Sequence, residues 1–139
     1  MTRILFVCHG NTCRSVLAEH IGRKKFGRDA EFTSAGLHPG SVDDTKSAIF
    51  TLKSLFDIDA SGHRPRDIHN VDVATFDLVV ALDTAVAKEF QTMFPSFPSD
   101  HLKNWKIKDP YGDDLTEYQK CASDINVELR NLSALQRGL

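Results

Sequence analysis

The sequence predicts an α/β protein in which helices cover both faces of a parallel sheet. Short apolar segments alternate with helical patterns along all 139 residues, and this order is typical of a parallel sheet between two layers of helices. The segment 76–82 is the most continuous apolar run, as expected for a central strand buried on both faces. The first apolar run leads through Gly and Asn into an amphipathic stretch, which indicates a strand, a tight loop and a helix.

The N-terminal half should contain two strands and two helices. They are expected in the order strand, helix, strand, helix, at about residues 3–7, 15–26, 31–35 and 43–56. Gly27 stops the first helix and Gly36 closes the second strand, while Asp43 or Asp44 would cap the second helix. The apolar face of that helix repeats every three or four residues and comprises Ala48, Ile49, Leu52, Leu55 and Phe56.

A polar loop with at most a short helix should occupy residues 57–72, because this stretch is rich in charged residues and carries Gly and Pro. The third strand follows at 76–82. A weaker fourth strand is expected at 101–107, with Trp105 as its largest buried side chain.

Two further helices complete the pattern. Asp83 or Thr84 would cap the third helix, which ends before Pro95 and turns Val86, Phe90 and Met93 toward the core. The final helix carries the clearest stripe, spaced by three and four: Leu115, Tyr118, Ala122, Ile125, Leu129 and Leu132. Since no linker, repeat or low-complexity tract interrupts the chain, we expect a single domain over residues 1–139.

Composition excludes several classes of protein. With 41% hydrophobic residues, 26% charged residues and a net charge of -2, the chain lacks the basic excess of a nucleic-acid binder. The apolar run after Arg3 is too short for a signal peptide or a membrane span. Three cysteines, an odd number, favour a reducing compartment. We therefore expect a cytoplasmic protein that binds neither nucleic acid nor a membrane. A monomer is the expected oligomeric state, although composition does not determine it.

The segment 7–15, VCHGNTCRS, is the predicted functional site. A loop between a buried strand and a helix directs backbone N–H groups and the positive end of the helix dipole at one point, which favours an anion such as phosphate. Gly10 and Asn11 tolerate the left-handed backbone that such a turn requires. The same field stabilises a thiolate at Cys8, and the planar fork of Arg14 suits two oxygens of one phosphoryl group. Ser15 can donate a hydrogen bond to the sulfur.

At these residues the chain resembles the low-molecular-weight protein tyrosine phosphatases, whose loop reads C-x-G-N-x-C-R-S. The matching positions are Cys8, Gly10, Asn11, Cys13, Arg14 and Ser15, followed along the chain by Ala18-Glu19, Ser34-Ala35-Gly36, Gly62-His63, Leu82-Asp83 and Asp109-Pro110-Tyr111. The resemblance implies a sheet with strand order 2-1-3-4. It also implies hydrolysis of phosphotyrosine or aryl phosphate monoesters through a phosphocysteine, with no cofactor and no metal.

The resemblance also implies a role for each site residue. Cys8 would attack phosphorus, and Asp109 would protonate the leaving oxygen and later activate water. Arg14 and the rest of the pocket would bind substrate: His9, Gly10, Asn11, Thr12, Cys13, Ser15, Leu37, His38 and Tyr111. His63, through Asn11, and Asp83 would hold the loop in shape. By itself an Asp-Pro pair is an ordinary turn, and Tyr111 is equally compatible with a half-exposed core tyrosine.

Other functions remain open on the sequence alone. A thiol-linked arsenate reductase uses the same fold but needs two further cysteines around the third strand and the following helix, and residues 80–90 contain none. A non-catalytic phosphotyrosine-binding module would not need Cys8 and Asp109, and a flavodoxin-like cofactor binder would have no use for Cys8. Cys13 lies close enough in sequence to form a protective, reversible disulfide with Cys8. Cys121 is expected to serve packing.

Overall fold

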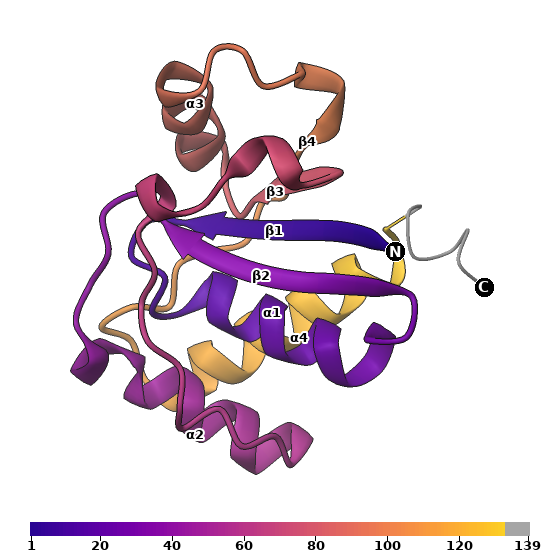
Figure 1. Cartoon of the computed structure of the whole chain (residues 1–139). Helices are drawn as coiled ribbons and strands as arrows, with labels where there is room; N and C mark the ends of the chain where they lie inside the picture. Colours follow the sequence, from indigo (N-terminus) through magenta and orange to yellow (C-terminus); the bar gives the residue numbers. More distant parts are fainter. Residues whose placement is uncertain (133–139) are drawn as a thin grey trace.

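The computed structural model describes residues 1–132 and contains a parallel sheet with the strand order β2-β1-β3-β4 (Figure 1). The strands are β1 (Thr2–Cys8), β2 (Ala30–Gly36), β3 (Leu78–Ala81) and β4 (Leu102–Asn104). The predicted fold class and strand order are confirmed. Because β1 lies between β2 and β3, the loop that follows it emerges at the middle of the sheet edge, where ligands bind in open α/β sheets.

Helices cover both faces of the sheet, as predicted. They are α1 (Arg14–Phe26), α2 (Lys46–Phe56), α3 (Thr84–Met93) and α4 (Leu115–Arg130). Helices α1 and α4 lie against one face and α3 against the other, while α2 packs on α1 and α4 (Figure 1). Short 3₁₀ turns, η1 to η4, occupy residues 42–45, 68–70, 73–75 and 99–101.

The sheet separates two hydrophobic cores, one on the side of α1 and α4 and one on the side of α3. Successive side chains of the central strand β1 belong alternately to one core and to the other. Ile4 and Phe6 belong to the core under α1 and α4, where Phe6 lies 5.5 Å from Trp105 between ring centroids. Leu5 and Val7 belong to the core on the α3 side. Side chains along a strand point alternately to opposite faces, so Cys8 shares the α1 and α4 side with Phe6. This alternation directs the Cys8 sulfur toward the start of α1.

Two strands are shorter than the apolar runs that predicted them. β3 begins at Leu78 and ends at Ala81, and Phe76 and Asp77 connect it to η3, which ends at Thr75. β4 ends at Asn104, although Trp105 N–H still donates to the Ala81 carbonyl (2.9 Å) and Ile107 N–H to the Leu82 carbonyl (2.9 Å). The chain beyond β4 therefore stays beside the end of β3 without forming a regular ladder.

Three details of the predicted helices are wrong. Neither Asp43 nor Asp44 caps α2: Ser41 and Asp44 form a reciprocal capping box around η1, which precedes it. Leu55 and Leu115 are 49% and 44% exposed, because α2 buries only a narrow face and Leu115 is the first residue of α4. Leu132 is buried as predicted, but it lies after the end of α4.

Within residues 1–132, no helix combines the length and apolarity that a membrane crossing requires. The single domain predicted over residues 1–139 stays a prediction, since residues 133–139 lie outside the described part.

Gly36 should be intolerant of any side chain. A Cβ built there would lie 2.8 Å from the Gly10 carbonyl carbon and 2.9 Å from the Asn11 nitrogen, both backbone atoms of the loop after β1. We expect Gly36→Ala to lower the free energy of unfolding by about 1–3 kcal/mol, because the two segments would be forced apart. Urea unfolding measures this. Gly62→Ala, which meets no atom within 4 Å, is the control, and equal stability of the two variants would contradict the prediction.

Candidate active site

The loop between β1 and α1 is held by the side chain of Asn11. This residue is completely buried and adopts a left-handed backbone conformation (φ 55°). Its Nδ2 donates to Ser15 Oγ and to Ser34 Oγ, both at 2.8 Å. Its Oδ1 accepts from the Arg66 backbone N–H at 2.9 Å. One carboxamide thus joins the loop to α1, to β2 and to the segment before η2.

Further backbone contacts fix the same loop from outside. His63 Nε2 lies 3.3 Å from the Asn11 carbonyl oxygen, so the structure brings these two residues together as predicted. The loop also accepts hydrogen bonds from the chain after β2: His38 N–H donates to the His9 carbonyl (2.8 Å), and Gly40 N–H to the Gly10 carbonyl (2.9 Å). The backbone is therefore constrained before any ligand arrives.

Cys8, the last residue of β1, lies behind this loop with 3% of its surface exposed. Its Sγ is 2.8 Å from Ser15 Oγ. Ser15 also accepts from Asn11 Nδ2, so its hydroxyl proton is free to point at the sulfur, where it would stabilise a thiolate. Helix α1 has no acidic residue in its first turn and no side-chain cap at Cys13, which leaves its N-terminal field available to an anion.

Arg14 provides a buried positive charge beside the sulfur. It is 3% exposed, and its Nη1 donates to Asp83 Oδ2 (2.6 Å) and to the Ile107 carbonyl (3.0 Å). Burial alone would lower the pKa of Arg14, but the hydrogen bond to Asp83 and the negative charges of Cys8 and Asp109 outweigh it and raise the pKa. Its Nε is buried and has no hydrogen-bond partner among the described residues.

Asp83 has two structural functions. Its Oδ1 accepts from Val86 N–H (2.8 Å) and caps α3, while its Oδ2 pairs with Arg14. Burial would raise the pKa of Asp83, but the hydrogen bonds from Arg14 and Val86 outweigh that and hold the pKa below its usual value. Asp83 thereby neutralises and orients Arg14, the first residue of α1, whereas the role in holding the loop that the resemblance implied for Asp83 stays a prediction.

Asp109 and Tyr111 lie on the segment after β4. Asp109 Oδ2 is 3.7 Å from Arg14 Nη2, and its Oδ1 accepts from Tyr111 N–H at 3.0 Å. The Tyr111 ring is exposed, and its hydroxyl donates to Asp44 Oδ1 at 3.0 Å. Hydrogen bonds from the Ser41 N–H, the Tyr111 hydroxyl and the Ser41 hydroxyl keep the pKa of Asp44 low. The two rim segments therefore touch each other.

These groups surround a pocket of about 250 Å³. Its lining is formed by Cys8, His9, Gly10, Thr12, Cys13, Arg14, His38, Gly40, Asp44, Asp109 and Tyr111. Leu37 was predicted to bind substrate but is buried in the core on the α3 side, where the alternation of the segment after β2 places it. Asn11 and Ser15 were also predicted to bind substrate, but they are buried and are not among the lining residues. They influence the pocket through the residues that they position, such as Cys8.

Several residues of the site escaped the sequence analysis. Asp44 was interpreted only as a helix cap, and nothing local indicated that it would meet Tyr111, which lies 67 positions away. Ser34 and Glu19 were noted as matching motifs without a role, yet the Ser34 hydroxyl donates to Glu19 while accepting from Asn11. The backbone of Arg66 had no sequence signal at all.

The three cysteines differ in their surroundings, and all are free. Burial raises the pKa of Cys13, whose Sγ is 3.1 Å from the Tyr118 hydroxyl. Burial also raises the pKa of Cys121 to about 12. A disulfide between Cys8 and Cys13 stays a prediction, and forming it would break the contact between Cys13 and Tyr118.

The ion pair of Asp83 should make stability pH-dependent. Its folded pKa lies below the unfolded value of about 3.9, so the stabilisation is present above that value and is lost as the pH falls through the folded pKa. We expect Asp83→Asn to unfold at lower urea than the parent at pH 7, with a smaller difference at pH 3. Asp100→Asn, at an 83% exposed side chain, is the control. A difference that is constant with pH would contradict this assignment.

Comparisons with known proteins agree with the geometry. A family model described as low molecular weight phosphotyrosine protein phosphatase matches residues 3–137. The chain is 34% identical over 128 residues to an arsenate reductase of Staphylococcus xylosus, covering 92% of this chain and 93% of the relative.

Solved structures share the fold across nearly the whole chain. A low molecular weight protein tyrosine phosphatase from T. tengcongensis superposes with a TM-score of 0.85 at 31% identity, covering 96% of this chain and 98% of that one. An arginine phosphatase from Geobacillus stearothermophilus also gives 0.85, at 25% identity and with 96% and 91% covered. By the match of its sequence over residues 3–137, this chain belongs to the low molecular weight phosphotyrosine protein phosphatase family.

Proposed function

We propose that the protein is a cysteine-dependent phosphatase that hydrolyses aryl phosphate monoesters, including phosphotyrosine, through a phosphocysteine. The observation that carries this proposal is the shared pocket of about 250 Å³, which a thiol (Cys8), a guanidinium (Arg14) and a carboxyl group (Asp109) line together. A nucleophile, an anion-binding group and a proton donor are the components that this reaction needs. A reducing compartment would keep Cys8 active, so the proposal includes the cytoplasm.

In the first step, the Cys8 thiolate attacks phosphorus. An S–P bond forms and the P–O bond to the aryl group breaks, while Asp109 gives its proton to the departing oxygen. Arg14 binds the transferring oxygens with Nη2 and with Nε, the buried donor that lacks a partner among the described residues. The α1 N-terminus adds its positive field.

In the second step, water attacks the phosphocysteine. Asp109 accepts a proton from the water, the S–P bond breaks, and phosphate leaves. The sulfur departs as a thiolate, which the Ser15 hydroxyl at 2.8 Å stabilises. Tyr111, exposed at the rim, offers its ring to the aromatic part of the substrate.

Reduction of arsenate is the alternative that the names of the curated relatives raise. That reaction requires thiols to supply two electrons. Here Cys13 is buried against Tyr118, and Cys121 is buried with its pKa raised to about 12. Burial raises the pKa of both and holds them as thiols, and a Cys8–Cys13 disulfide would protect Cys8 inside the pocket rather than carry electrons away from it, which favours hydrolysis. A pure phosphotyrosine-binding module is disfavoured because both Cys8 and Asp109 line the pocket.

Hydrolysis of an aryl phosphate in the presence of EDTA tests the proposal. Activity should peak on the acid side of neutral, because a thiolate and a protonated Asp109 must coexist. Cys8→Ser should abolish activity, and Asp109→Asn should lower kcat by about 10²–10⁴-fold. Cys121→Ala and Asp100→Asn are matched controls that should retain activity. An inactive parent that reduces arsenate with an added thiol would refute the proposal.

Phosphoarginine is a second candidate substrate, favoured by the two carboxylates, Asp44 and Asp109, that line the pocket. They would attract a guanidinium next to the phosphoryl group, and a relative with the same fold is an arginine phosphatase. Should phosphoarginine be the substrate, Asp44→Asn would lower its kcat/KM by about tenfold (1.4 kcal/mol) and that of a phosphotyrosine peptide much less. A parent that prefers the phosphotyrosine peptide would exclude this candidate.

A further inference from the structure

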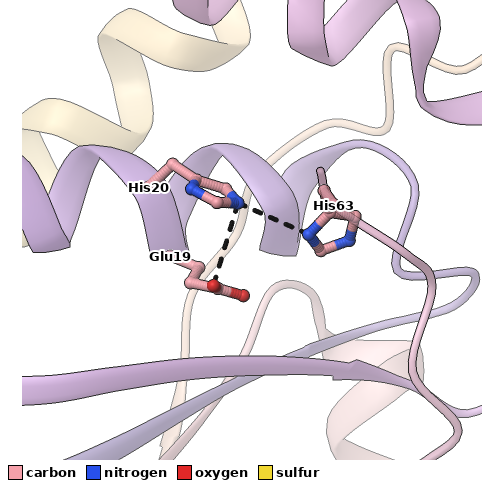
Figure 2. A group of neighbouring side chains, drawn as sticks. All are labelled: Glu19, His20 and His63. Carbon is pink, nitrogen blue, oxygen red and sulfur yellow. Dashed lines mark hydrogen bonds and ion pairs between the residues drawn. The ribbon is translucent and has the colours of Figure 1, made fainter. Parts of the chain in front are cut away.

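Three potential metal ligands meet outside the pocket, on the segments that support the phosphate-binding loop. Glu19 and His20 lie on α1, and His63 lies in the loop between α2 and η2 (Figure 2). His20 Nε2 is 3.4 Å from His63 Nδ1 and 3.8 Å from Glu19 Oε2, and the three ligand atoms lie within 4.8 Å of one another. The sequence led us to expect no metal, and these three residues come from two segments of the chain that only the fold brings together.

The distances are those expected between two ligands of one metal ion. His20 Nε2 lies at a long hydrogen-bond distance from His63 Nδ1 (3.4 Å), and Glu19 Oε2 lies further from it at 3.8 Å. Ligands at about 2.0–2.1 Å from a tetrahedral zinc ion stand roughly 3.3–3.4 Å apart. The separation of the two imidazole nitrogens matches that edge, and a small rotation of Glu19 would bring its oxygen to the same separation.

The position of the proton on the His63 ring leaves Nδ1 available to bind a metal. Its other nitrogen, Nε2, lies 3.3 Å from the Asn11 carbonyl, which can only accept. Nε2 therefore carries the proton, and Nδ1 presents a lone pair toward His20. A ring nitrogen that donates to a carbonyl while the other binds metal is the usual arrangement of metal-bound histidine.

The Glu19 carboxylate is the negative charge that a bound cation would contact. Glu19 is 5% exposed and accepts from Arg23 Nη1 at 2.8 Å. Arg23 Nε also donates to the Phe32 carbonyl at 3.1 Å, and the side chain is 51% exposed, so a metal ion that takes the place of Nη1 at Glu19 would have to displace this half-exposed guanidinium. His20 and His63 are only partly buried, so water can complete the coordination.

We propose that Glu19, His20 and His63 form a binding site for one divalent transition-metal ion of the zinc type. Two imidazole nitrogens and one carboxylate oxygen are a donor set that Zn²⁺ accepts. His63 would connect the ion to the phosphate-binding loop, because its Nε2 contacts the Asn11 carbonyl of that loop. Binding of the ion would thereby stiffen the loop. The proposal does not depend on the reaction proposed for the pocket.

Zinc binding is best measured in a Cys8→Ser background, which removes the pocket thiol as a competing ligand. Competition with a chromogenic chelator should give one zinc per chain. Adding His20→Gln should weaken binding at least about tenfold, since loss of even an outer-sphere partner costs about 10–100-fold. His101→Gln, at a half-exposed histidine near α3, is the matched control. Cobalt(II) should give visible bands typical of tetrahedral coordination without a thiolate band.

Two results would overturn the site: zinc bound equally well after His20→Gln, or zinc bound by the parent and lost in Cys8→Ser. The unfolding midpoint without metal checks that His20→Gln folds, and the polar contacts of His20 given above are with His63 and Glu19. Arg23→Gln gives a second, independent measurement. It should tighten zinc binding, because it removes the cation that competes for Glu19, and unchanged or weaker binding would contradict the proposal.

Discussion

The left-handed turn at Asn11 is the constraint on which the site depends. A side chain at this backbone conformation is costly, and it persists because the carboxamide makes three hydrogen bonds that are removed from water. Each unmet partner in such a network would cost about 1–3 kcal/mol. The network fixes Ser15 against Cys8, so the geometry of the sulfur is determined by an amide that never reaches the pocket.

The order of the strands explains why the other charged groups arrive at the same place. β3 is the neighbour of β1, so Asp83, two residues beyond its end, meets the first residue of α1. The segment after β4 runs beside the end of β3 and brings the Ile107 carbonyl to Arg14, with Asp109 two residues further on. The carboxyl ends of parallel strands share one sheet edge. A buried guanidinium with two anions and a carbonyl around it is the electrostatic centre of that edge.

The family supports more than one chemistry on this fold, so the residues around the loop carry the distinction. Relatives of this chain are named for the reduction of arsenate and for the removal of phosphate. All three cysteines of this chain are buried, and burial raises the pKa values of Cys13 and Cys121, which holds these two as thiols. The pocket rim instead carries Tyr111 and Asp44, joined to each other. These features of the cysteines and the rim are the basis on which we propose hydrolysis rather than electron transfer.

The sequence by itself determined the alternation of strands and helices and the predicted anion-binding loop with Cys8 and Arg14 as candidates, because periodicity and loop chemistry are local properties. Asp109 became a candidate only through the family resemblance. The strand order came from the family resemblance. Only the tertiary structure decided that Leu37 is buried, that Tyr111 meets Asp44, and that Glu19, His20 and His63 converge. The residues in these contacts come from separate segments of the chain. Their distances depend on how helices and loops pack on the sheet, and no spacing along the chain records that packing.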